Sequence, residues 1–110
     1  MIDIMTKSIK KTTLKRNDTF KIIQTESISN RSEFNRFINW VSAEYELHLQ
    51  ENHKGLKIYF PGSCLQISEK DYLKGAFNFE IEIQSKYEKN GIQISNQVLS
   101  ILNHLKHFIC

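Results

Sequence analysis

Residues 76–84, AFNFEIEIQ, decide the fold, because large apolar and polar side chains alternate along them. The apolar positions are Phe77, Phe79, Ile81 and Ile83, and the polar positions are Asn78, Glu80, Glu82 and Gln84. An extended backbone sends successive side chains to opposite faces, so this period of two predicts a strand with one buried face and one open face. The buried face requires a covering layer from elsewhere in the chain.

A first amphipathic helix is predicted to begin after Asn30. Asn30 precedes Glu33 by three residues, the spacing of a capping box. The apolar residues that follow recur at intervals of three and four and share one helical face: Phe34, Phe37, Ile38, Val41, Tyr45 and Leu49. We expect this helix to end near residues 52–55, where Gly55 could close it.

A second amphipathic helix is predicted at the C-terminal end, capped by Ser95 or Asn96. Its apolar stripe consists of Ile94, Val98, Ile101, Leu102, Leu105 and Ile109. Residues 85–91 are expected to form a loop, and residues 92–94 a short strand.

The remaining strands come from residues 19–25, which are rich in β-branched side chains, and from a hairpin over residues 56–68 that turns at Pro61 and Gly62. The predicted order is strand, helix, three strands, helix. We therefore predict an α+β fold over residues 18–110, with an antiparallel sheet of four to five strands and both helices on one face.

Positive charge is concentrated at the N-terminus. The net charge is +4 over residues 1–24 and −1 over residues 25–110. We interpret residues 1–17 as a flexible basic arm or an edge strand, which could solubilise the chain or neutralise nucleic-acid phosphates. The cations that would contact nucleic acid are Lys7, Lys10, Lys11, Lys15 and Arg16.

The N-terminal sequence predicts a cytoplasmic protein, since no apolar run follows its lysines as in a secretory signal or a membrane span. Two cysteines, Cys64 and Cys110, are too few for a disulfide framework, and we expect both to be free thiols.

Three potential metal ligands, His104, His107 and Cys110, are spaced by three residues near the C-terminus. On a helix these side chains fan around the polar side instead of converging, so we predict no metal site. No glycine-rich phosphate loop or nucleophile elbow is present either. We therefore expect a protein that is not an enzyme and needs no cofactor.

Trp40 and Leu47 form the first candidate binding surface. They lie seven residues apart on the predicted first helix, away from its core stripe, and Glu44 flanks them. An exposed tryptophan with an aliphatic neighbour and a charged rim is typical of a protein-binding hot spot. The alternative is that the sheet edge or the N-terminal arm covers both side chains.

Asn78, Glu80 and Glu82 form the second candidate surface, on the open face of the central strand. Two carboxylates on one face would suit a basic partner, although a solvated sheet face has the same composition. Together the two surfaces predict a small inhibitor or immunity protein that occludes the active site of a toxin or enzyme, possibly a nuclease. The alternatives are a nucleic-acid binder using the basic arm and a homo-oligomer that buries Trp40.

Overall fold

The computed structural model describes residues 10–16, 19–52, 55–70 and 77–108. The strands are β1 Lys10–Arg16, β2 Thr19–Ile28, β3 Leu49–Glu51, β4 Gly55–Phe60, β5 Ser63–Glu69 and β6 Phe77–Ser85. The helices are α2 Arg31–Glu44 and α3 Glu88–Phe108. Within these residues the strands form one antiparallel six-stranded sheet in the order β1-β2-β6-β5-β4-β3.

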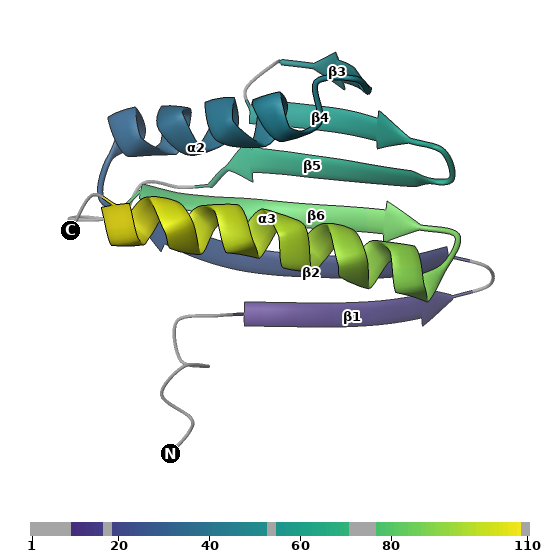
Figure 1. The fold of residues 1–110 in the computed structure, drawn as a ribbon. Coiled ribbons are helices and arrows are strands. Elements are labelled where there is room, and N and C mark those ends of the chain that lie inside the picture. Colours follow the sequence, from purple (N-terminus) through teal and green to yellow (C-terminus); the bar gives the residue numbers. More distant parts are fainter. Residues whose placement is uncertain (1–9, 17–18, 53–54, 71–76, 109–110) are drawn as a thin grey trace.

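Both helices lie on the same face of the sheet and leave the other face without a helical cover (Figure 1). They run in opposite directions, with α2 near β4 and α3 across β6 and β2. The predicted α+β class, antiparallel sheet and one-sided helix layer are confirmed. The sheet is larger than the predicted four to five strands, because β1 pairs with β2 and the three-residue β3 pairs with β4.

The central strand β6 has the two faces that its alternation predicted. Phe77, Phe79, Ile81 and Ile83 are buried under the helices, while Asn78, Glu80 and Glu82 lie on the other face. The ring of Phe79 lies 5.2 Å from that of Phe34 and 5.3 Å from that of Phe37, both on α2. The aromatic contacts between β6 and α2 therefore fix the first helix on the sheet.

The start of α2 is where the sequence placed it, because Asn30 caps it. The Asn30 Oδ1 atom accepts a hydrogen bond from the Glu33 amide at 2.9 Å. The end of α2 is not where it was predicted: the helix stops at Glu44, not near residues 52–55. The Gln50 side chain explains this, since its Nε2 donates to the carbonyl oxygens of Ser42 and Tyr45 at 3.0 and 2.8 Å. These bonds satisfy carbonyls that a longer helix would have used.

The start of α3 was also predicted wrongly. The helix begins at Glu88, so residues 92–94 are helical and not a strand, and neither Ser95 nor Asn96 caps it. Ser85 ends β6 and turns the chain into α3, since its Oγ accepts from the Tyr87 amide at 3.1 Å and donates to the Tyr87 carbonyl at 2.8 Å. This tight turn leaves no room for the predicted loop.

Strand β2 extends three residues past the predicted Thr25 and buries two polar side chains under α3. Gln24 and Glu26 are 2% and 6% exposed. The Gln24 Nε2 donates to Glu26 at 2.6 Å, and the Lys106 ammonium of α3 lies 3.7 Å from the same carboxylate. Pairing of this kind permits a carboxylate to be buried between the sheet and the helix layer.

Candidate functional site

The predicted binding residues lie on two opposite faces of the molecule. Trp40 and Glu44 are on α2, in the helix layer, whereas Asn78, Glu80 and Glu82 are on the sheet face that the helices leave open. Leu47 is in the turn after α2, so it does not share a helical face with Trp40 as predicted. A single compact interface cannot include both groups.

Trp40 is less exposed than its helical position suggested. Its side chain is partly buried and packs against the hydrophobic core. Leu47, by contrast, is 93% exposed, and Leu49 in β3 is 71% exposed. Among the described residues these are the two most exposed large apolar side chains. Leu49 pairs with Tyr59 whereas Gln50 pairs with the buried Ile58, so Leu49 points to the open sheet face. We call the turn that carries the exposed Leu47 side chain, residues 45–48, the leucine corner.

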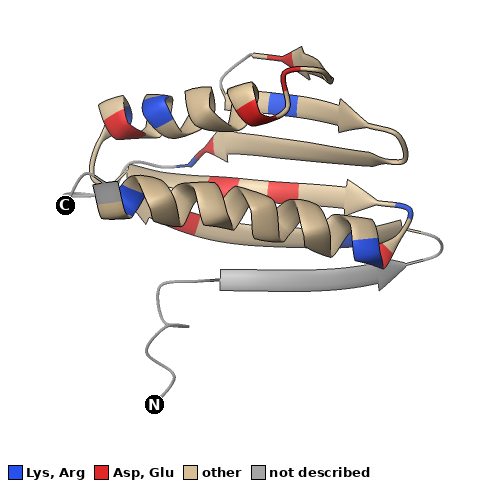
Figure 2. Ribbon diagram, viewed as in Figure 1, with Lys and Arg blue, Asp and Glu red and all other residues tan. Residues whose placement is uncertain are grey.

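The acidic positions of β6, red in Figure 2, are accompanied by cations. The Lys21 ammonium lies 3.3 Å from Glu82, and the Lys70 ammonium lies 4.0 Å from Glu80. The Gln84 side chain also donates to Glu82 at 3.0 Å. These contacts reduce the negative potential of the open sheet face, and with it the ability of Glu80 and Glu82 to attract a basic partner.

A groove of about 500 Å³ lies between the two helices. Trp40, Ala43 and Glu44 of α2 form one wall, and Gln97, Ser100, Ile101 and His104 of α3 form the other. The Gln97 Nε2 donates to a carboxylate oxygen of Glu44 at 3.0 Å across the groove. This bond is also part of the wall of a second hollow, because Glu44 and Gln97 line both.

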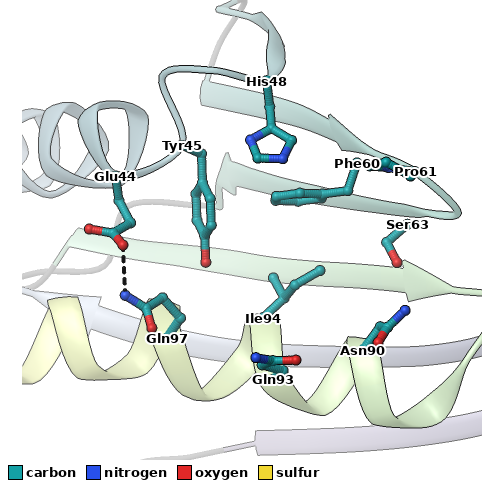
Figure 3. A pocket seen from close by; sticks show the side chains of 10 residues that line it. All are labelled: Glu44, Tyr45, His48, Phe60, Pro61, Ser63, Asn90, Gln93, Ile94 and Gln97. Carbon is teal, nitrogen blue, oxygen red and sulfur yellow. Dashed lines mark hydrogen bonds between the residues drawn. The ribbon is translucent and has the colours of Figure 1, made fainter.

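The second hollow, which we call the aromatic pocket, has a volume of about 340 Å³ and lies between the end of α2, the β4–β5 turn and the first half of α3 (Figure 3). Its aromatic wall consists of Tyr45, His48 and Phe60. The Phe60 ring centre lies 5.0 Å from that of Tyr45 in an edge-to-face arrangement and 4.7 Å from that of His48. These mutual contacts hold the three rings in place.

The opposite wall of the aromatic pocket is polar and comes largely from α3. Asn90, Ile94 and Gln97 lie across the opening from the aromatic rings, and Gln93 also lines the pocket (Figure 3). Ser63 lies at the β5 end, and its Oγ donates to Ser85 at 2.8 Å. The His48 Nδ1 is buried and has no hydrogen-bond partner among the described residues. The pocket therefore combines an apolar ring surface with amide and hydroxyl groups on the facing wall.

The surroundings of Tyr45 in this pocket shift the pKa of its phenol. Burial, and secondarily the Glu44 carboxylate, raises the pKa of the Tyr45 phenol to about 12 from its ordinary value of 10.0. The folded state therefore favours the neutral phenol. The stability that the neutral Tyr45 side chain contributes is fully present below pH 10 and is lost as the pH rises towards 12.

We expect ultraviolet absorbance to resolve this titration. The difference between the phenolate titration curves of the native chain and Tyr45→Phe should show one phenol that ionises near pH 12. A difference curve with its midpoint at pH 10 would place the Tyr45 hydroxyl in water and contradict the burial described above.

Sequence reasoning missed Tyr45, His48, Phe60 and the α3 amides as site residues. The predicted helix would have included Tyr45 and His48, and both lie instead beyond its end in the pocket wall. A correct position for the end of α2 would have brought Tyr45 and His48 out of the helix, but the Gln50 contacts that define this end are tertiary.

The described residues contain no group of three His, Cys, Asp or Glu side chains that could hold a metal ion. His104 and His107 lie on α3, and Cys110 is outside the described residues. Cys64 on β5 is a free thiol, with its pKa raised chiefly by burial. Of the predicted nucleic-acid contacts, Lys10, Lys11, Lys15 and Arg16 lie in β1, and Lys7 is outside the described residues.

Neither helix in the described part of the chain is long and apolar enough to cross a membrane. Comparison with known proteins returned no match to a family model, a curated protein or a solved structure. The candidate site therefore rests on its own geometry.

Proposed function

We propose that this chain is a non-catalytic protein-binding protein, a small cytoplasmic inhibitor or immunity protein that neutralises a toxin or enzyme by occluding its active site. The binding face is the helix layer, which holds the groove and the aromatic pocket, together with Leu47 in the turn after α2. Trp40, Glu44 and Leu47 belong to this face, and Asn78, Glu80 and Glu82 do not. A basic target such as a nuclease would be attracted by Glu44.

The observation that carries this proposal is the exposure of Leu47 in the turn whose residues Tyr45 and His48 line the aromatic pocket. A leucine that is 93% exposed in an ordered turn contributes almost nothing to the core. Interface hot spots typically combine apolar side chains with a pocket that contains a few polar groups. On the open sheet face, by contrast, the carboxylates of Glu80 and Glu82 already have cationic neighbours, which reduces their attraction for a basic partner.

Affinity capture from host extract, followed by an activity assay on the captured protein, tests this function. Stoichiometric addition of the chain should abolish the activity of the isolated target. Leu47→Ala should weaken binding by about 1–2 kcal/mol or more without changing the free energy of unfolding, since Leu47 makes few contacts in the free chain. Gln66→Ala, an exposed substitution on the open sheet face, serves as the matched control and should bind normally.

Two results would contradict the proposal. One is a captured protein whose activity the chain leaves unchanged at saturation. The other is a loss of binding in Gln66→Ala combined with normal binding in Leu47→Ala, which would move the interface to the open sheet face.

Nucleic-acid binding through the basic N-terminal segment is the second candidate function. Four of its cations lie in the seven-residue strand β1, at one edge of the sheet. Deleting β1 would disturb the sheet, so glutamine substitutions at Lys10, Lys11, Lys15 and Arg16 are the appropriate variant. Oligonucleotide binding that falls steeply with salt and disappears in this variant would favour the second function, whereas the proposed protein interface should largely tolerate both changes.

A further inference from the structure

The described residues that line the aromatic pocket include one carboxylate, Glu44, and no lysine or arginine. None of the ion pairs between described residues involves Glu44, whereas Glu26, Glu69, Glu80 and Glu82 each have a cationic partner. Gln97 donates one neutral hydrogen bond to Glu44, which orients the carboxylate and leaves its charge in place. The pocket is therefore electrostatically suited to a cation and unsuited to an anion.

The aromatic wall favours a cation that is flat. The rings of Phe60, Tyr45 and His48 pack on one another and together form the wall of the pocket that faces α3. Cations are attracted to aromatic faces, and a planar guanidinium can also stack on such a face. An ammonium group gains only the charge attraction and retains a stronger hydration shell.

The polar wall offers hydrogen-bond acceptors. Ser63 uses its proton in the bond to Ser85, so its oxygen can accept a hydrogen bond. The side-chain carbonyl groups of Asn90 and Gln93 supply further acceptors on the α3 side. An arginine side chain has five donors and no acceptor, which matches a pocket of this kind.

We propose that the aromatic pocket binds the guanidinium group of an arginine side chain, with Glu44 as counter-ion and the aromatic wall of Tyr45, His48 and Phe60 as stacking surface. The arginine would be a residue of the target protein, and this assignment rests on the proposed inhibitory function. Occupation of the pocket by a basic side chain of an active site would explain how a small chain blocks that site.

N-acetyl-arginine amide is the probe that tests the pocket without any partner. Its titration into the ¹⁵N-labelled chain should give saturable chemical-shift changes confined to the segments that line the pocket: residues 44–48, 60–63 and 90–97. N-acetyl-citrulline amide, the neutral isostere, should give no saturable change. The corresponding lysine amide should bind more weakly than the arginine amide.

Two variants test the roles of the charge and the ring. Glu44→Gln keeps an oxygen that can accept from Gln97 but removes the charge, and should weaken arginine amide binding about tenfold or more. Glu46→Gln is the matched control, since Glu46 is an exposed carboxylate in the following turn and outside the pocket lining; it should bind normally. Phe60→Leu retains an apolar side chain, and loss of binding in a variant with a native-like spectrum would confirm stacking.

Four results would each overturn the proposal. They are equal binding of the citrulline and arginine amides, normal binding by Glu44→Gln, binding of the lysine amide as tight as that of the arginine amide, and preferential binding of inorganic phosphate. These outcomes are distinguishable from failure of the inhibitory function. The arginine probe can fail while the chain still inhibits its target through the leucine corner, and it can succeed while no target is inhibited.

Discussion

Phe79→Ala is expected to lower the free energy of unfolding by about 3–5 kcal/mol. Phe79 is fully buried in the central strand, and its ring contacts those of Phe34 and Phe37 on α2. Truncation would leave a cavity between the sheet and the helix that the surrounding rings could fill only partly. Urea denaturation at equilibrium, with a common slope for both proteins, measures the loss.

Glu80→Ala is the matched control on the opposite face of the same strand. Glu80 is partly exposed and makes one long ion pair with Lys70, so its removal should change stability by less than about 1 kcal/mol. Equal losses in the two variants would mean that the helices cover the other face of β6.

Gly55→Ala is expected to cost about 2–6 kcal/mol, combining about 1–3 kcal/mol of backbone strain with a similar amount for the clash. Gly55 begins β4 with a φ of 140°, a conformation that side chains other than glycine rarely adopt. A Cβ atom at this position would lie 2.1 Å from the backbone oxygen of Ile67 on β5. The hairpin backbone would have to shift to accommodate it.

Gly62→Ala separates the conformational cost from the clash. Gly62 also has a positive φ, at 76°, but its added Cβ would meet only the flexible Lys86 side chain at 3.9 Å. We expect a loss of about 1–2 kcal/mol from backbone conformation alone. A thermal melt in which Gly62→Ala is as damaging as Gly55→Ala would contradict the close approach of β4 and β5.

Local sequence signals predicted much of this fold because they act over a few residues. The alternation along β6 identified its buried face, Asn30 identified the start of α2, and Pro61 with Gly62 identified the β4–β5 turn. Each of these features depends on backbone geometry or on neighbours within one turn.

The missed boundaries depend on contacts between distant residues. The end of α2 is fixed by Gln50, which returns from β3 to bond the last helical turn. Gly91 suggested a loop, yet it lies within α3, where an added Cβ would come within 2.8 Å of the Phe20 ring. A glycine selected for helix packing cannot be distinguished from a turn glycine by sequence alone.

The candidate site was only partly predictable for the same reason. Trp40, Glu44 and Leu47 were found because their hydrophobicity or charge conflicted with a simple helical pattern. Phe60 and Gln97 were not, since each has an ordinary place in its own element: Phe60 in the alternation of β4, and Gln97 on the polar side of α3. Only the packing of α3 on the sheet brings Phe60 and Gln97 to one pocket.

The most direct test of the proposed binding face is site-specific photo-crosslinking in the native host. A photoreactive phenylalanine analogue would replace Leu47 in one variant and Gln66 in another, because both positions are exposed and lie on different faces. The proposal predicts a discrete crosslinked adduct with the target from position 47 and none from position 66. An adduct from position 66 alone would contradict the helix-layer interface and assign binding to the open sheet face.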